Sequence, residues 1–293
     1  MKKIFITILV LFFMVSMAHA HSVWINAFES TTHQPSHVMV SLGWGHALPM
    51  DDILNSPNGV MHVKNFDLIA PGMKKTSLQK PSSKISEPVV TSRNFDIFPG
   101  DLAVQKVAFK KDTKPGVYQF ALASNPNFYT QYIDKKGKPR MKLKPKNEIR
   151  DIKKVLMSVK FAAFAKAYAT VGKWTNPKPL GHALEIIPRT DLSNVHVGDL
   201  VEVDVLFYGT PLSATAKSID YITAHSDSFG QSDGFMLFSY LMDGKAQFRV
   251  QSAGQWIISV THKDDVTKDG PLKALFGKAE QVYNSATLTF TVK

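Results

Sequence analysis

Short stretches that alternate apolar and polar residues recur along the first half of the chain, with turn residues between them. They cover residues 22–28, 37–44, 61–69, 101–109 and 116–123, and Pro-Gly pairs follow at 71–72, 99–100 and 115–116. Alternation places every second side chain on one face of a strand, and Pro-Gly pairs mark turns. This pattern is typical of an antiparallel β-sandwich rather than of alternating strands and helices.

Residues 155–171, VLMSVKFAAFAKAYATV, carry an apolar residue at every odd position, whereas the even positions include Ser158, Lys160 and Lys166. This period of two favours one long strand. The many alanines, together with apolar residues at 152, 155, 156 and 159, leave a helix as the alternative, mainly for the first half of the segment.

The segment at 172–181, GKWTNPKPLG, contains two prolines and two glycines, and we interpret it as the connection between two domains. Strand patterns then resume at 182–188, 199–209, 218–225, 246–254, 255–262 and 285–293. We therefore predict an all-β protein with two antiparallel β-sandwich domains in tandem, of immunoglobulin-like or transthyretin-like type. The N-terminal domain covers residues 21–175, and the C-terminal, immunoglobulin-like domain covers residues 176–293.

The first residues have the features of a signal peptide. Lys2 and Lys3 precede an apolar run at 4–17, and Ala18-His19-Ala20 fits the small-x-small rule for signal peptidase. We expect residues 1–20 to be cleaved after Ala20 and the protein to be periplasmic. No later segment approaches the ~20 apolar residues that cross a bilayer, so no stable membrane insertion is expected.

The amino-acid composition limits the kinds of site and of partner that the protein can have. The chain has no cysteine, which excludes disulfides, thiolate metal sites and a lipid-modified cysteine. Its net charge of +11 would fall to +9 with the loss of Lys2 and Lys3. Much of this charge lies at 135–146, KKGKPRMKLKPK, which we interpret as a solvated loop, with attraction to an anionic membrane or partner as the alternative. An exported protein meets no genomic DNA, so no nucleic-acid partner is expected.

Cleavage after Ala20 would make His21 the first residue of the mature chain. Its free α-amine and its imidazole Nδ1 could then chelate one Cu, Ni or Co ion. The third residue of the mature chain would be Val23, which excludes the amino-terminal copper and nickel motif, because that motif needs histidine at this position.

The best source of a second nitrogen ligand is His46 in LGWGHALPMDD, residues 42–52. Two glycines let the backbone bend around Trp44 and His46 at a strand end, and a proline stiffens the following turn. Asp51 or Asp52 could add an oxygen ligand or fix the imidazole tautomer. In the alternative interpretation, His46 packs on Trp44 and Asp51 caps a short helix.

Three residues of the second half are further candidates. His182 is either a ligand that reaches a cleft between the domains or a hydrogen-bonded structural histidine, and His262 is expected to face solvent. Glu185 is a lone acid in an apolar run, which favours a buried ion pair over an acid/base couple. The chain has neither a GxSxG elbow nor a phosphate-binding glycine loop, so we predict no catalytic residues.

Several stretches occur together in one order: HSVWIN after the leader, VSLGWGHALPMDD, GHALEIIPRTDLSNVHVGDLVEVDVLFYGTPL and GQWIISVTH. In this respect the chain resembles the DUF4198 family of exported bacterial proteins over essentially its whole length after the leader. The resemblance implies a periplasmic component associated with nickel or cobalt uptake, with histidines matching His21, His46 and His182. It implies no catalytic reaction.

We therefore expect a non-enzymatic periplasmic protein that binds Ni²⁺ or Co²⁺ and serves an uptake permease of the ABC or ECF type. The expected ligands are His21, His46, His182 and Asp51. Nitrogen ligands suit Cu²⁺ equally well, and Zn²⁺ also stays open. Two alternative functions remain: a metal-free module that binds glycans or envelope proteins through aromatics such as those at 128–132, and a copper-dependent oxidoreductase with an N-terminal histidine site.

Overall fold

The computed structural model describes residues 21–30, 36–57, 59–213, 220–230 and 236–293, so the expected signal peptide lies outside the described residues. Within these ranges the regular structure consists of strands and three short 3₁₀ helices, η1 (Lys146–Glu148), η2 (Leu192–Asn194) and η3 (Lys273–Leu275). The prediction of an all-β protein is confirmed.

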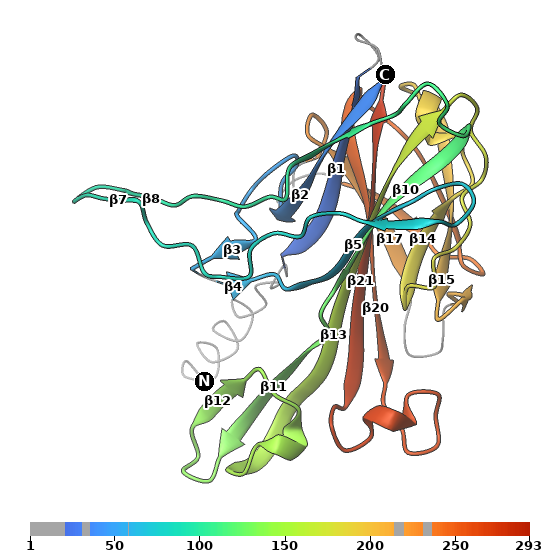
Figure 1. The fold of residues 1–293 in the computed structure, drawn as a ribbon. Coiled ribbons are helices and arrows are strands. Elements are labelled where there is room, and N and C mark those ends of the chain that lie inside the picture. Colours follow the sequence, from blue (N-terminus) through green and yellow to red (C-terminus); the bar gives the residue numbers. More distant parts are fainter. Residues whose placement is uncertain (1–20, 31–35, 58, 214–219, 231–235) are drawn as a thin grey trace, which may run out of the picture.

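One large sheet runs through the middle of the molecule (Figure 1). Its strands, in spatial order, are β18 (Leu237–Tyr240), β17 (Tyr221–Ser226), β20 (Gly254–Asp265), β21 (Gln281–Val292), β13 (Ile152–Val171), β10 (Gly116–Ser124), β5 (Val63–Ile69) and β6 (Lys75–Ser77). β11 (Asn127–Asp134) pairs with the first half of β13, and β12 (Pro139–Lys142) pairs with β11. β13 and β21 run parallel, and because they come from different halves of the chain, the two predicted domains share this central sheet.

Two smaller sheets lie on opposite faces of the central sheet. One consists of β1 (Ser22–Ser30), β2 (His37–Gly45) and β9 (Gln105–Ala108), and the other of β14 (Leu184–Pro188), β15 (Leu200–Phe207), β16 (Thr210–Pro211) and β19 (Lys245–Arg249). Two short hairpins complete the described fold: β3 (Asn55–Ser56) with β4 (Gly59–Val60), and β7 (Val90–Thr91) with β8 (Asp96–Ile97). The β7–β8 hairpin projects away from the three layers (Figure 1).

The alternation of side chains along β13 assigns each residue to one of two cores. Ala163, Ala165 and Ala167 are buried in the core that β13 forms with β1, β2, β5 and β10. Phe164 and Tyr168, which point to the other face, pack in the core with β14, β15, β20 and β21. The predicted long strand at 155–171 is therefore confirmed, and the two cores lie on opposite faces of one sheet.

Lys166 of β13 and Glu185 of β14 form a buried ion pair. Their side chains are 2% and 0% exposed, and Lys166 Nζ lies 2.9 Å from Glu185 Oε1. The backbone N–H groups of Leu180 and Gly181 also donate to this carboxylate. Burial alone would raise the pKa of Glu185, but the Lys166 ammonium and these hydrogen bonds together hold the pKa below its usual range. The expected buried ion pair is thus confirmed.

The interpretation of His262 as solvent-facing is wrong. The residue is 5% exposed, and its Nδ1 lies 3.0 Å from Oδ1 of Asp220. Its ring also contacts Phe207, with 4.4 Å between ring centroids. The reason is that β20 continues through Asp265, so that His262 is part of the strand and points inward.

The aromatics at 128–132, which the alternative binding function would use, lie in a strand, β11, and one of them, Tyr132, is only 2% exposed. Most of the basic segment at 135–146 is exposed, as predicted, but it contains β12 and folds into a hairpin. Asp134 stabilises this hairpin, because its carboxylate accepts the backbone N–H groups of Lys136 and Lys138 and the side chain of Arg140.

The buried ion pair gives a stability prediction. K166M leaves the Glu185 carboxylate buried without its cation, which should lower the free energy of unfolding by about 3–5 kcal/mol. The double variant K166M/E185Q should recover part of this loss, because the glutamine carries no charge and retains an oxygen for one of the two N–H donors, at 180 or 181, which the carboxylate accepts on separate oxygens. Urea unfolding monitored by tryptophan fluorescence measures both effects. Unfolding of K166M at the wild-type midpoint would contradict the prediction.

Candidate functional site

His21 and His46 meet at one end of the β1–β2 pair. His21 directly precedes β1, His46 directly follows β2, and the antiparallel register places Ser22 opposite Gly45. The two histidines are therefore neighbours across the ladder, with 4.5 Å between their ring centroids. The His21 ring also lies against Trp44, at a centroid separation of 5.2 Å.

Asp51 lies behind His46. Its Oδ2 accepts the backbone N–H of His46 at 2.7 Å and lies 3.3 Å from Nδ1 of the same residue. The loop folds back here because the N–H of Asp52 donates to the carbonyl of Trp44 at 3.0 Å. A proton on Nδ1 that is shared with Asp51 makes Nε2 the nitrogen with a lone pair for a metal. The short helix of the alternative interpretation, which Asp51 would cap, is not formed, and Asp51 instead contacts the His46 imidazole.

Two glycines of β2 are required for this geometry. A Cβ on Gly43 would lie 2.0 Å from Nε1 of Trp24, and a Cβ on Gly45 would lie 2.3 Å from Oδ2 of Asp51. Gly45 also has a φ of +122°, which side chains rarely tolerate. We expected these glycines to let the strand bend, and the structure gives the additional reason that they make room for the indole and the carboxylate.

A buried asparagine that the sequence reasoning missed ties the loop to two sheets. Asn26, which is 1% exposed, donates from Nδ2 to the carbonyl of Pro49 at 3.0 Å. Its Oδ1 accepts the indole N–H of Trp24 at 3.0 Å and Nε2 of Gln255, in β20, at 2.8 Å. The signal in the sequence is a polar residue inside the apolar run VWINAF, since a buried polar group needs partners. This network holds the loop that carries His46.

His182 lies on the other face of the central sheet. Its ring stacks on Phe164, with 4.9 Å between centroids, and Phe164 points away from the face that β1 covers. Burial lowers the pKa of His182 from 6.5 to about 4, so the imidazole is neutral at pH 7. The structure therefore brings together His21, His46 and Asp51 and keeps His182 apart from them.

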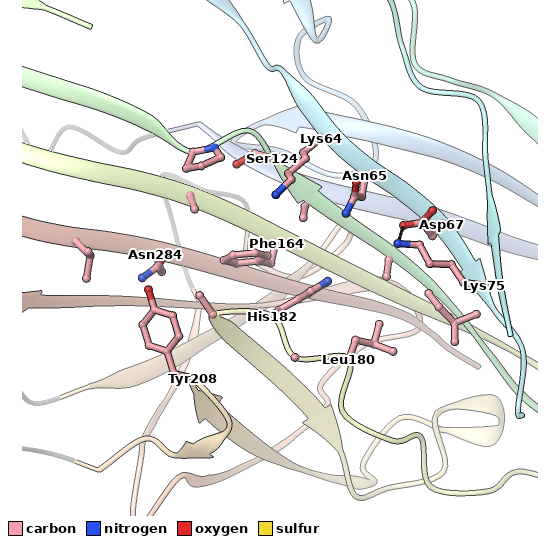
Figure 2. Close-up of a pocket in the computed structure, with 18 of the residues that line it drawn as sticks. Lys64, Asn65, Asp67, Lys75, Ser124, Phe164, Leu180, His182, Tyr208 and Asn284 are labelled. Carbon is pink, nitrogen blue, oxygen red and sulfur yellow. Dashed lines mark ion pairs between the residues drawn. The ribbon is translucent and has the colours of Figure 1, made fainter. Parts of the chain in front are cut away.

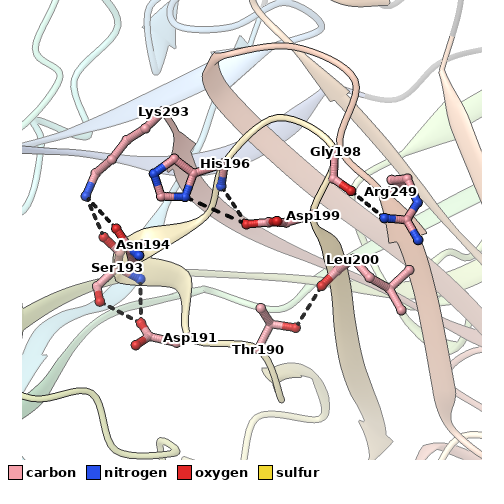
Figure 3. A network of polar contacts seen from close by, with 10 residues as sticks. All are labelled: Thr190, Asp191, Ser193, Asn194, His196, Gly198, Asp199, Leu200, Arg249 and Lys293. Atoms are coloured by element: carbon pink, nitrogen blue, oxygen red, sulfur yellow. Dashed lines mark hydrogen bonds and ion pairs between the residues drawn. The ribbon is translucent and has the colours of Figure 1, made fainter.

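The arrangement of His46 on Asp51 has a counterpart elsewhere in the chain. His196 donates its backbone N–H to Asp199 Oδ2 at 2.9 Å, and its Nδ1 lies 3.8 Å from the same oxygen (Figure 3). A turn in which an aspartate accepts the backbone N–H of a preceding histidine therefore occurs twice in the described part of the chain. The feature that distinguishes the site at His46 is the second imidazole, that of His21.

Among the described residues, no group of three or more His, Asp or Glu side chains is arranged to hold a metal ion. His21 and His46 supply two imidazoles, and Asp51 contacts one of them. A complete nitrogen site thus needs a donor besides these side chains. The α-amine that cleavage after Ala20 would create at His21 is such a donor, because it belongs to the residue that is already in place.

The sequence model of a family described as "Domain of unknown function (DUF4198)" matches residues 18–264. The chain belongs to the DUF4198 family. The match covers His21, His46, Asp51 and His182, and the family description names no activity. A comparison with curated proteins gives no match. In the part of this DUF4198 chain that the structure describes, no helix has the length and apolar character needed to cross a membrane.

The need for glycine at position 45 can be tested by G45A. The added methyl group would overlap the Asp51 carboxylate and would strain a backbone with a φ of +122°, so we expect a loss of about 2–3 kcal/mol in unfolding free energy. The matched control is G137A, at a φ of +79° with no atom within 4 Å of the added Cβ, which should cost about 1 kcal/mol. Equal losses in the two variants, measured by urea unfolding, would contradict this role of Gly45.

The pKa of His182 predicts a loss of stability in mild acid. The unfolded chain binds a proton at the ordinary pKa of 6.5, whereas the folded chain does so only near 4, so stability falls as the pH falls through this interval. Between pH 7 and pH 5 the contribution is about 1–2 kcal/mol. H182F retains the stacked ring and should flatten the pH dependence of the urea midpoint. H196F, at an exposed histidine, should leave the slope unchanged, and a wild-type slope in H182F would refute the assignment.

Proposed function

We propose that this protein is a periplasmic, non-enzymatic binding protein that captures a divalent transition-metal ion, Ni²⁺ or Co²⁺, for an uptake permease. The observation that carries the proposal is the 4.5 Å separation of the His21 and His46 ring centroids. The choice of nickel or cobalt rests on the resemblance to DUF4198 proteins associated with the uptake of these metals. Imidazole and amine ligands alone would favour Cu²⁺.

The spacing of the two imidazoles suits ligation of a single ion. Metal–nitrogen bonds to histidine are about 2.0–2.1 Å long, so two nitrogen ligands of one ion lie at most about 4 Å apart. Two rings with centroids 4.5 Å apart can meet this limit by small side-chain rotations. With the α-amine of a processed His21, the site would have three nitrogen donors, and Asp51 would orient the His46 ring.

The location of the site favours transfer of the ion to a partner. His21 is exposed, and the side chains of His46 and Asp51 are 32% and 37% exposed, so an ion held here could be reached by another protein. The net charge, which is +11 for the full chain and +9 after loss of Lys2 and Lys3, opposes long-range attraction of cations, which leaves local chelation as the source of affinity.

The test is isothermal titration of Ni²⁺, Co²⁺, Cu²⁺ and Zn²⁺ into exported protein whose N-terminal residue is verified as His21 by mass spectrometry. We expect one ion per chain. A version with a methionine before His21 should bind at least about 100-fold more weakly, and so should H46A, since even the loss of a residue that orients a ligand costs about 10–100-fold. D51N should lose about 10–100-fold.

The matched control for H46A is H196A, which removes a histidine in the same local arrangement without a neighbouring imidazole and should bind like the wild type. Absence of binding in the processed protein, or equal binding with the α-amine blocked, would refute the proposal. Turnover of ascorbate or peroxide by the Cu²⁺-loaded protein would instead support the oxidoreductase alternative.

A further inference from the structure

A cavity of about 500 Å³ lies on the face of the central sheet opposite β1 (Figure 2). The sheet that contains β14 and β15 packs over β17, β20 and β21, and leaves part of this face over β5, β10 and β13 without a second layer. Three alanines, Ala121, Ala123 and Ala162, line the cavity here, and their short side chains leave room above the sheet. The volume is within the range of small-molecule sites.

The walls of the cavity are positively charged. Of the described lining residues, Lys64, Lys75 and Lys160 are basic and Asp67 is the only acid. Asp67 is already engaged, because its carboxylate lies 2.7 Å from Lys75 Nζ and accepts a hydrogen bond from Ser77. Lys64 points its ammonium group toward the space above the sheet (Figure 2). The local charge therefore favours an anion.

Two buried polar atoms of the lining lack hydrogen-bond partners among the described residues. They are Nδ2 of Asn284, a residue that is 3% exposed, and Nδ1 of His182. A buried polar group that remains unsatisfied costs about 1–3 kcal/mol, so such atoms mark a place where a ligand can contribute hydrogen bonds. The Asn284 amide N–H can only donate, and Nδ1 of the neutral His182 imidazole donates in one of its two tautomers, so a hydrogen-bond acceptor can satisfy both atoms.

The turn that carries His182 is held in place by the buried carboxylate of Glu185. The Glu185 carboxylate accepts the N–H groups of Leu180 and Gly181 at 2.7 and 3.0 Å, and the buried Lys166 ammonium holds this carboxylate in place. The imidazole is therefore positioned over the Phe164 ring before any ligand arrives. Such preorganisation reduces the entropy cost of binding.

We propose that this cavity binds a small organic carboxylate. Lys64 and Lys160 supply the charge, Asn284 and His182 donate hydrogen bonds to the carboxylate oxygens, and the alanines with Phe164 contact the carbon skeleton. These apolar side chains favour an organic carboxylate over an inorganic anion, because an inorganic anion has no carbon skeleton to contact them. The site is independent of the metal site, because the two lie on opposite faces of the sheet.

Isothermal titration with glutarate and benzoate tests the proposal. Glutaramide serves as the uncharged analogue, and inorganic phosphate serves as an anion without a carbon skeleton. At least one carboxylate should bind with submillimolar affinity, glutaramide should not bind, and phosphate should bind at least tenfold more weakly than the carboxylate. K64M/K160M and N284L should each weaken carboxylate binding at least tenfold. The control K142M/K144M removes two lysines of the exposed hairpin outside the cavity and should bind like the wild type.

Lys64 is exposed and Lys160 is half-buried, so the lysine variant should fold even if N284L does not. Both variants should retain the wild-type response to Ni²⁺, whether or not the protein binds this ion. Absence of carboxylate binding would overturn the inference. Equal affinity for phosphate, or carboxylate binding that both cavity variants retain, would overturn it as well.

Discussion

The structure depends on the use of both faces of β13, a strand of 20 residues whose side chains alternate between two cores. On one face, alanines at 163, 165 and 167 allow the β1–β2 sheet to pack closely. On the other face, Phe164, Lys166 and Tyr168 meet the C-terminal half of the chain. A slip of one residue would exchange the two faces and would place the Lys166 ammonium in the alanine-lined core, so the pairing register is strongly fixed.

The position of the candidate metal site follows from this register. Parallel pairing of β13 with β21 directs Thr287 and Thr289 toward β1, where their hydroxyl groups donate to the carbonyls of Val23 and Ile25. β1 is thereby attached to the central sheet from the second residue after His21 onward. The Asn26 network then attaches the loop that carries His46. Residues held by rigid strands define a ligand geometry better than residues on free loops do.

The sequence predicts those elements of the fold whose signal is local. Alternation identified β13 and β15, and a lone acid in an apolar run indicated the Glu185 ion pair. β11 and β12 were missed because proline, lysine and asparagine at their ends have the composition of a loop. The burial of His262 could not be predicted either, because its partner, Asp220, lies 42 positions away in the sequence.

The candidate site was predictable only in part, because the sequence shows which residue types are present but not which distant residues come together. His21 and His46 were chosen by residue type, but their proximity follows from the β1–β2 register, which places Ser22 opposite Gly45 and is not visible in the spacing. His182 is separated from His21 and His46 because it stacks on Phe164, which points to the face of β13 that β1 does not cover. The connection at 172–183 brings the chain across to that face. No local pattern specifies that crossing.

The two histidine environments differ in electrostatics as well as in position. A cation next to His46 would have the Asp51 carboxylate behind the imidazole, which favours the positive charge. A cation next to His182 would face a cavity lined by Lys64, Lys75 and Lys160. Among the described lining residues the one acid is Asp67, which is already paired with Lys75. Both imidazoles could offer a lone pair, yet the lysines make His182 a poor cation ligand and a suitable neutral donor to an anion. The surrounding charges, more than the residue type, therefore separate the proposed metal-binding role at one face from the proposed anion-binding role at the other.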